Sequence, residues 1–147
     1  MFNQKYGIPR EGEMHWTLGI GVAHDRDTHT ISLSQEEHIN NLVECFGLQN
    51  GSTVTTLLEP GAILTKGRCP TTPAELQGMS GNRYRELIGS LQYVALATRP
   101  DISFAISKPA QFLVNPAHIH LDVAIRVLRY LKGTRNGPSI SEGTSRI

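Results

Sequence analysis

Carboxylates that converge on one point are what a metal-dependent or general acid–base enzyme needs, and this chain has few of them. The 147 residues include four aspartates, none adjacent to another: Asp25, Asp27, Asp101 and Asp122. The first two fall in a polar stretch that is typical of a turn, where aspartate is favoured for local hydrogen bonding. The histidine pairs at 24 and 29 and at 118 and 120 lack the helical spacing with a companion glutamate that zinc hydrolases use. We therefore expect no catalytic residue and no metal ligand here.

A cation, a glycine and an aromatic recur along one predicted helix, at Arg85, Gly89 and Tyr93. Their i, i+4, i+8 spacing places them on one face, opposite the apolar positions of that helix. Glycine inside a helix costs about 1 kcal/mol relative to alanine, which indicates a close approach to the backbone. A nucleic-acid minor groove would use all three, with charge for phosphate, bare backbone for approach and a ring for sugar. Tight helix packing at Gly89 and Ser90 explains the glycine equally well.

Charge is divided unevenly along the chain. Residues 83–135 carry eight Lys or Arg against three Asp or Glu, whereas residues 1–82 carry five against nine. Such a change of sign suggests that one half faces a polyanion. On the last predicted helix, a basic arc is formed by Arg126, Arg129 and Lys132. A solvated helical face is the alternative interpretation of these cations.

The elements that must position these residues predict an α+β fold. Apolar alternation through Leu18, Ile20 and Val22 and again after residue 30 predicts a β-hairpin whose turn is residues 24–29. Apolar spacing of three and four predicts a helix after Ser34 and three more helices in the second half. The expected divisions are a hairpin with its helix over residues 1–48, a Pro- and Gly-rich linker over 49–82, a helical segment over 83–135 and a frayed tail over 136–147.

Some helix ends can also be predicted. Asn82 is expected to cap the helix that carries Arg85, and that helix should end before the Arg99-Pro100 pair. Pro109 falls inside the next short helix, where proline costs roughly 3 kcal/mol. Only the stretch after Thr72 in the linker is compatible with a short helical turn.

Two stretches of the second half, YRELIGSLQYVALATRPDISFAIS and FLVNPAHIHLDVAIRVLRYLKGT, closely resemble the reverse transcriptase region of copia-type LTR retrotransposon polyproteins. Upstream, LGIGVAHDRDTHTISLSQEEHINNLVECFGL and TTLLEPGAILTKGRCP are similar to the stretch that precedes it in that family. The resemblance runs roughly from Glu13 to Thr134. It implies a right-hand polymerase whose palm holds catalytic aspartates, followed by a thumb and an RNase H domain.

The resemblance also implies roles for individual residues. The palm-edge stretch at Thr17, Leu18 and Gly19 resembles the primer grip, and Arg85, Gly89 and Tyr93 match thumb positions that track the template–primer minor groove. The family's catalytic aspartates and their Mg²⁺ would lie upstream and the RNase H carboxylates downstream, so we expect no cofactor in this chain. We expect a polyprotein fragment that is inactive alone and binds at most an RNA–DNA or DNA template–primer duplex, with the palm and RNase H regions as its other partners.

Two other hypotheses stay open. Leu57, Pro109, Leu121 and Gly21 depart from the family pattern, which is consistent with a non-functional relic of a transposon. A domesticated module that binds nucleic acid or protein is the other possibility. The sequence shows neither a secretory signal nor an 18-residue apolar run, so we expect a cytoplasmic or nuclear protein and no membrane partner.

Overall fold

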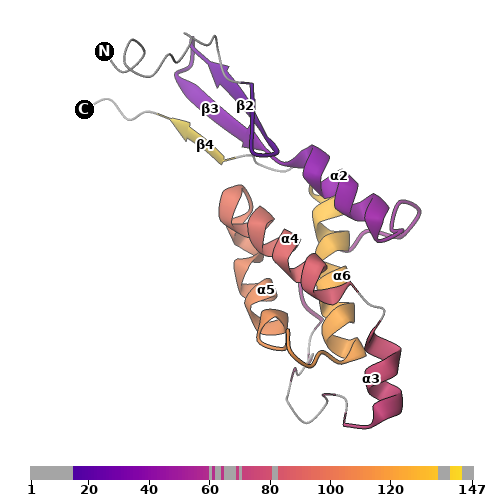
Figure 1. The fold of residues 1–147 in the computed structure, drawn as a ribbon. Helices are drawn as coiled ribbons and strands as arrows, with labels where there is room; N and C mark the ends of the chain where they lie inside the picture. The colour runs from indigo at the N-terminus through magenta and orange to yellow at the C-terminus, as the bar shows by residue number, and fades with distance from the viewer. Residues whose placement is uncertain are drawn as a thin grey trace, which may run out of the picture.

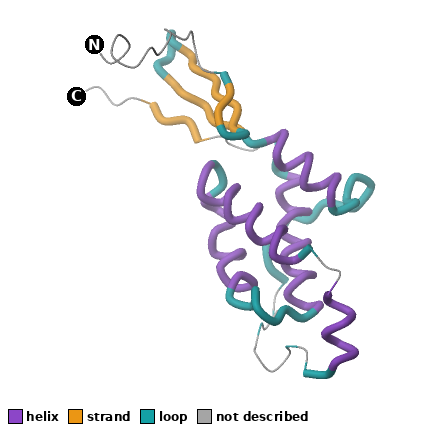
Figure 2. The backbone as a smooth tube through the Cα atoms, in the orientation of Figure 1, coloured by secondary structure: helices purple, strands orange, loops and turns teal. Residues whose placement is uncertain are grey.

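The computed structural model describes residues 15–59, 61, 64, 69, 71–80, 83–135 and 140–143. A small antiparallel sheet stands at one end of a helical unit, and the helix that follows the sheet leads into that unit (Figure 1). The tube in Figure 2 shows the same division, with the strands gathered above and the helices below. This architecture confirms the predicted α+β class. No helix in the described part of the chain is long and apolar enough to cross a membrane.

The sheet has four strands in the order β1-β2-β3-β4, with every neighbouring pair antiparallel. The strands are β1 (Trp16–Thr17), β2 (Ile20–Asp25), β3 (Thr30–Ser34) and β4 (Ile140–Gly143). The predicted hairpin is formed by β2 and β3, with Val22 opposite Leu33. Its turn is closed by Asp25, whose carboxylate accepts the backbone N–H groups of Asp27 at 2.9 Å and Thr28 at 3.3 Å. The turn itself is shorter than the predicted 24–29, because His24 and Asp25 are the last residues of β2 and pair with Ile31 and Thr30. The predicted local hydrogen bonding of Asp25 at the turn is confirmed.

Leu18 lies in a turn and not in the strand that the alternation predicted. It has a φ of 51°, Gly19 has a φ of 78°, and together they form the two-residue connection between β1 and β2. Two successive positive φ angles fit the right-handed twist of a hairpin, and glycine adopts such an angle without strain. The side chain of Leu18 is consequently 85% exposed.

Part of the tail forms a strand where the sequence predicted fraying. Ile140 lies opposite Leu33 and Gly143 opposite Thr30, so β4 covers the outer edge of β3. The unpaired backbone N–H and C=O groups of an edge strand can accept a further strand. Because this pairing joins residues far apart in the chain, the local sequence pattern of the tail did not predict it. The rest of the predicted tail, residues 136–139 and 144–147, lies outside the described residues.

The helical unit is built around one continuous apolar core. Its elements are α2 (Glu36–Cys45), α3 (Pro73–Ser80), α4 (Tyr84–Ala97), the 3-10 turn η2 (Pro100–Ile102), α5 (Ser103–Ala110) and α6 (His118–Gly133). The predicted apolar faces are the buried ones, with Leu87, Ile88, Leu91, Val94, Val127, Leu128 and Leu131 all fully inaccessible. They form a single core with buried side chains of α2 and α5, such as Ile39 and Ile106.

Helix starts differ in detail from the prediction. The residue that precedes α2 is the buried Gln35 and not the predicted Ser34. Gln35 accepts a 2.8 Å hydrogen bond from the Thr98 hydroxyl, while Ser34 Oγ accepts the N–H of Glu36 at 3.3 Å. The residue that precedes α4 is Arg83, and Asn82 lies outside the described residues.

The linker contains a full helix, α3, because its start is capped from both sides. Glu75 accepts the backbone N–H groups of Thr71 at 3.1 Å and Thr72 at 3.3 Å, and the Thr72 hydroxyl accepts the Glu75 N–H at 3.4 Å. Such a reciprocal capping box satisfies donors that the first turn of a helix leaves unpaired. These bonds also lower the pKa of Glu75.

Pro109 is accommodated without a break in α5. It is the seventh of eight helical residues, so its missing N–H removes only one bond near the end of the helix. The side chain is buried, and its carbonyl accepts the Tyr84 hydroxyl at 2.6 Å and the Phe112 N–H at 3.0 Å. The predicted cost of this proline is therefore confined to the last turn.

Candidate nucleic-acid interface

The outer face of α4 carries the stripe that the spacing predicted. Arg85 and Gly89 are exposed and Tyr93 is half-buried, whereas the opposite face of the helix is in the core. A Cβ atom added at Gly89 would meet no atom within 4 Å. No described element packs on this glycine, so the helix-packing explanation does not hold for the described part of the chain. Leu96, seven residues on and so on the same face, is 88% exposed.

Tyr93 connects this face to the β1–β2 turn. Its hydroxyl donates a hydrogen bond to the carbonyl oxygen of Leu18, across 75 residues of sequence. Its ring meets His38 of α2 edge-on, with centroids 5.4 Å apart and planes at 86°. The two groups of residues predicted to bind nucleic acid, one in the turn and one on α4, are therefore in direct contact.

Arg85 is oriented by the chain that follows α5. Its Nε donates to the carbonyl of Leu113 at 3.0 Å. The side chain is exposed, and within the described residues it forms no ion pair. Among the described residues, the guanidinium charge is therefore not neutralised by an acidic partner.

The predicted basic arc on α6 has a different environment. Lys132 donates to the carbonyls of Leu48, Gln49 and Gly51 at 2.9, 2.6 and 2.8 Å. Arg126 donates to the Thr56 hydroxyl at 2.8 Å and pairs with Glu59 at 3.4 Å. These two cations hold the segment 48–59 against α6 and do not form an open polyanion-binding face. Arg126 and Lys132 are also half-buried, so the alternative interpretation, a solvated helical face, does not describe them either.

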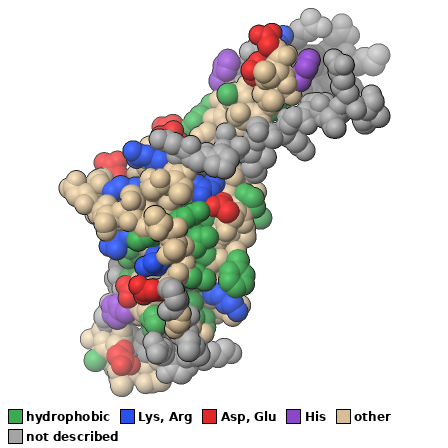
Figure 3. All heavy atoms as spheres, turned by 180° about the vertical axis from the view of Figure 1, so that it is seen from behind, with side chains coloured by type: hydrophobic (Ala, Val, Ile, Leu, Met, Phe, Trp, Pro, Cys, Tyr) green, Lys and Arg blue, Asp and Glu red, His purple; other side chains and the backbone are tan. Residues whose placement is uncertain are grey.

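Arg129, the middle residue of the arc, is half-buried, and its Nε is buried without a hydrogen-bond partner among the described residues. Figure 3 shows the helical unit from behind, with Lys and Arg side chains scattered among acidic ones rather than gathered into one patch. On this face of the helical unit, the excess of positive charge in the second half forms no single basic patch.

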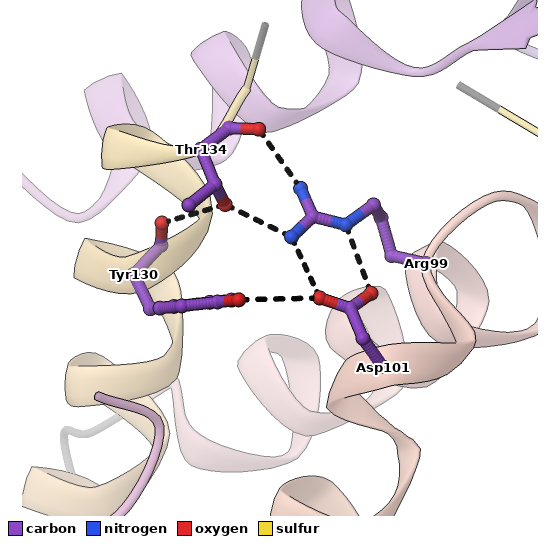
Figure 4. Close-up of polar contacts among 4 residues, drawn as sticks. All are labelled: Arg99, Asp101, Tyr130 and Thr134. Atoms are coloured by element: carbon purple, nitrogen blue, oxygen red, sulfur yellow. Dashed lines mark hydrogen bonds and ion pairs between the residues drawn. The ribbon is translucent and has the colours of Figure 1, made fainter. Parts of the chain in front are cut away.

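A partly buried polar cluster that the spacing did not predict joins the segment after α4 to the end of α6 (Figure 4). Arg99 forms two parallel bonds to the Asp101 carboxylate, at 2.9 and 2.8 Å. It also donates to the Thr134 carbonyl at 3.1 Å and to the Thr134 hydroxyl at 2.9 Å. The Arg99 guanidinium holds the pKa of Asp101 below its usual range. The available signal was the Arg-x-Asp spacing within ATRPDI, a bidentate pair formed across a proline.

No group of three or more His, Cys, Asp or Glu among the described residues is arranged to hold a metal ion. These residues therefore show no such cluster for the Mg²⁺ that the family resemblance implies for the palm.

Comparison with known proteins agrees with the resemblance in ATRPDI and RVLRYLKGT. The chain is 37% identical over 123 residues, or 84% of its length, to the Retrovirus-related Pol polyprotein from transposon TNT 1-94 of Nicotiana tabacum. It is 36% identical over 136 residues to the Retrovirus-related Pol polyprotein from transposon RE1 of Arabidopsis thaliana. This chain belongs to the retrovirus-related Pol polyproteins of transposons. The predicted retrotransposon origin is thus confirmed.

The chain spans only 9% of the tobacco polyprotein and 8% of the Arabidopsis one. It covers more of a shorter relative, the Putative transposon Ty5-1 protein YCL074W of Saccharomyces cerevisiae, with 30% identity over 131 residues and 40% of that protein. No protein-family model matches the chain, and no solved structure matches it.

Proposed function

We propose that this chain is the primer-grip and thumb part of a reverse transcriptase and that it binds a template–primer duplex. The duplex would lie along the outer face of α4, at Arg85, Gly89 and Leu96, and against the turn at Leu18 and Gly19. The observation that carries the proposal is Gly89, an unsubstituted position in the middle of α4 with open space above it. Polymerisation itself would use the palm of the same polyprotein, as in the family that the chain resembles.

The face has the chemistry of groove contact rather than of base reading. Arg85 supplies one positive charge for phosphate, and the remaining positions present backbone and apolar surface. Phosphate contacts position a protein on a duplex without recognising its sequence. Binding is expected to be weak and independent of sequence.

The shape of α4 favours an A-form-like duplex over B-form DNA. An α-helix with its side chains is about 10–12 Å wide, whereas the minor groove of B-DNA is only about 6 Å wide. An A-form minor groove is wide and shallow, and it displays sugar hydroxyls. A helix that approaches through a glycine therefore fits an RNA–DNA hybrid better than a DNA duplex of the same sequence.

The continuous core supports a folded and functional segment over a decayed relic. The apolar positions of α2, α4, α5 and α6 are filled, and Pro109 is placed where it costs little. We expect a cooperative unfolding transition for the isolated chain. A broad, non-cooperative transition would favour the relic instead.

Fluorescence anisotropy with a labelled RNA–DNA hybrid tests the proposal. Affinity should fall as salt rises, and Arg85→Ala should weaken binding and make the slope of log affinity against log salt shallower by about one unit. Lys108→Ala is the matched control, since it removes one exposed cation from α5. A DNA duplex of the same sequence should bind less tightly than the RNA–DNA hybrid. Equal losses for Arg85→Ala and Lys108→Ala, or no binding at low salt, would contradict the proposal.

A further inference from the structure

We infer that Tyr93 is a positioning residue, which fixes the β1–β2 turn on α4 so that turn and helix present one preformed surface. The inference rests on the proposed function and changes the role expected for Tyr93. The minor-groove pattern gives its ring a contact with sugar. In the structure the hydroxyl is already bonded to the carbonyl of Leu18, and the ring is half-buried.

Among the described residues, few other contacts hold this turn. β1 has two residues, and it pairs with β2 through Trp16 opposite Gly21 and Thr17 opposite Ile20. One further backbone bond runs from the Val22 N–H to the His15 carbonyl at 2.9 Å. Two-stranded pairing of this length is marginal on its own. Leu18 adopts a positive φ of 51° that non-glycine residues rarely occupy, and its 85% exposed side chain gains little from burial. A hydrogen bond from another element is therefore a large part of what orders this turn.

Tyr93 is itself held from a third element. His38 of α2 meets its ring edge-on at 5.4 Å, and α2 directly follows β3 of the same sheet. The His38 ring is half-buried, and its Nε2 is buried without a hydrogen-bond partner among the described residues. The His38 ring thus packs against the Tyr93 ring and restricts its position. Its contact keeps the hydroxyl directed at the turn.

A preformed turn lowers the cost of binding, because the duplex does not have to order it. Removing the Tyr93 hydroxyl should leave the ring and the helix intact but free the turn. From the cost of ordering a few mobile groups, we expect duplex affinity to fall about three- to tenfold. The loss should come through the turn and not through the hydroxyl's own contact with the duplex.

Tyr93→Phe separates these possibilities, with Tyr130→Phe as the matched control because it removes a hydroxyl at Asp101, away from the turn. The first measurement is amide hydrogen exchange of the free protein. Tyr93→Phe should speed exchange at Leu18, Gly19 and Ile20, and Tyr130→Phe should leave it unchanged. Unchanged exchange in Tyr93→Phe would overturn the inference, and this holds even if the protein binds no nucleic acid.

The second measurement is a double-mutant cycle of hybrid-duplex affinity with Leu18→Asp, which adds a negative charge at the turn and repels the duplex there. If Tyr93 acts through the turn, Tyr93→Phe should have no further effect in the Leu18→Asp background. Additive losses would show that the hydroxyl contacts the duplex directly and would overturn the positioning role. Absence of any duplex binding by the unchanged protein would instead refute the proposed function. The exchange result would then decide alone whether Tyr93 fixes the β1–β2 turn.

Discussion

Substituting Gly89 with alanine should stabilise the protein and weaken its binding to a duplex. The added methyl group would meet no atom within 4 Å, so it introduces no clash in the free chain. Alanine exceeds glycine in helix propensity by about 1 kcal/mol in a helix interior. Because the position is exposed and central in α4, most of this difference should appear as stability. We expect the free energy of unfolding to rise by about 0.5–1 kcal/mol.

The effect on binding should have the opposite sign. If a sugar–phosphate backbone lies against Gly89, the methyl group occupies space that the duplex needs. Adding a methylene-sized group to a packed contact typically costs about 1–3 kcal/mol. Since about 1.4 kcal/mol is a factor of ten, affinity should fall about fivefold or more.

Urea unfolding and hybrid-duplex anisotropy, measured on the same preparations, check both signs. Gly133→Ala is the matched control for stability, because a Cβ there would lie 3.1 Å from Thr53 Cβ and the gain in propensity should be offset. If Gly89→Ala is stabilised and binds as tightly as the unchanged protein, the groove does not approach α4 at this residue. A destabilised Gly89→Ala would show that the open space above α4 is filled in solution.

Three further predictions concern stability. Arg99→Ala removes the two guanidinium bonds to the Asp101 carboxylate and the two bonds to Thr134. Because Asp101 is partly solvated, we expect the free energy of unfolding in urea to fall by about 2–4 kcal/mol. Arg99→Lys should lose less stability, and a loss below about 1 kcal/mol in Arg99→Ala would refute the structural role. Lys132→Met keeps the aliphatic part of the side chain but removes the three hydrogen bonds to the carbonyls after α2. The free energy of unfolding should fall by about 1–3 kcal/mol, and amide exchange around Gly51 should become faster. An unchanged melting temperature would contradict this prediction. Burial lowers the pKa of His120, whose Nδ1 accepts the Ala117 N–H at 2.8 Å. The unfolded chain therefore binds the proton more readily, and stability should be complete above about pH 6.5 and fall as the pH drops below it. His120→Asn should reduce this dependence without abolishing it, because burial also lowers the pKa of His38.

Local patterns predicted the helical unit well, because burial imposes a period on each helix. The apolar spacing of α4 and α6 marks the residues that the structure buries, and the Asp25 turn follows from bonds within three residues. Partners distant in sequence were not accessible in this way. Nothing in the spacing of β1 or α4 indicates that Tyr93 reaches Leu18, or that the chain after α6 returns to pair with β3.

The contrast between α6 and α4 shows why charge is the weaker guide to function in this chain. A cation on a helix face satisfies backbone carbonyls as readily as phosphates, and its spacing is the same in both cases. Lys132 binds three carbonyls and Arg126 a threonine and a glutamate, so their charges are used inside the molecule. Gly89 has no such second use: its conformation is helical, nothing in the described structure touches it, and alanine would suit the free helix better. A glycine that lowers helix stability and touches no other described residue is best explained by contact with a partner. We therefore infer the duplex contact from Gly89 rather than from the cations.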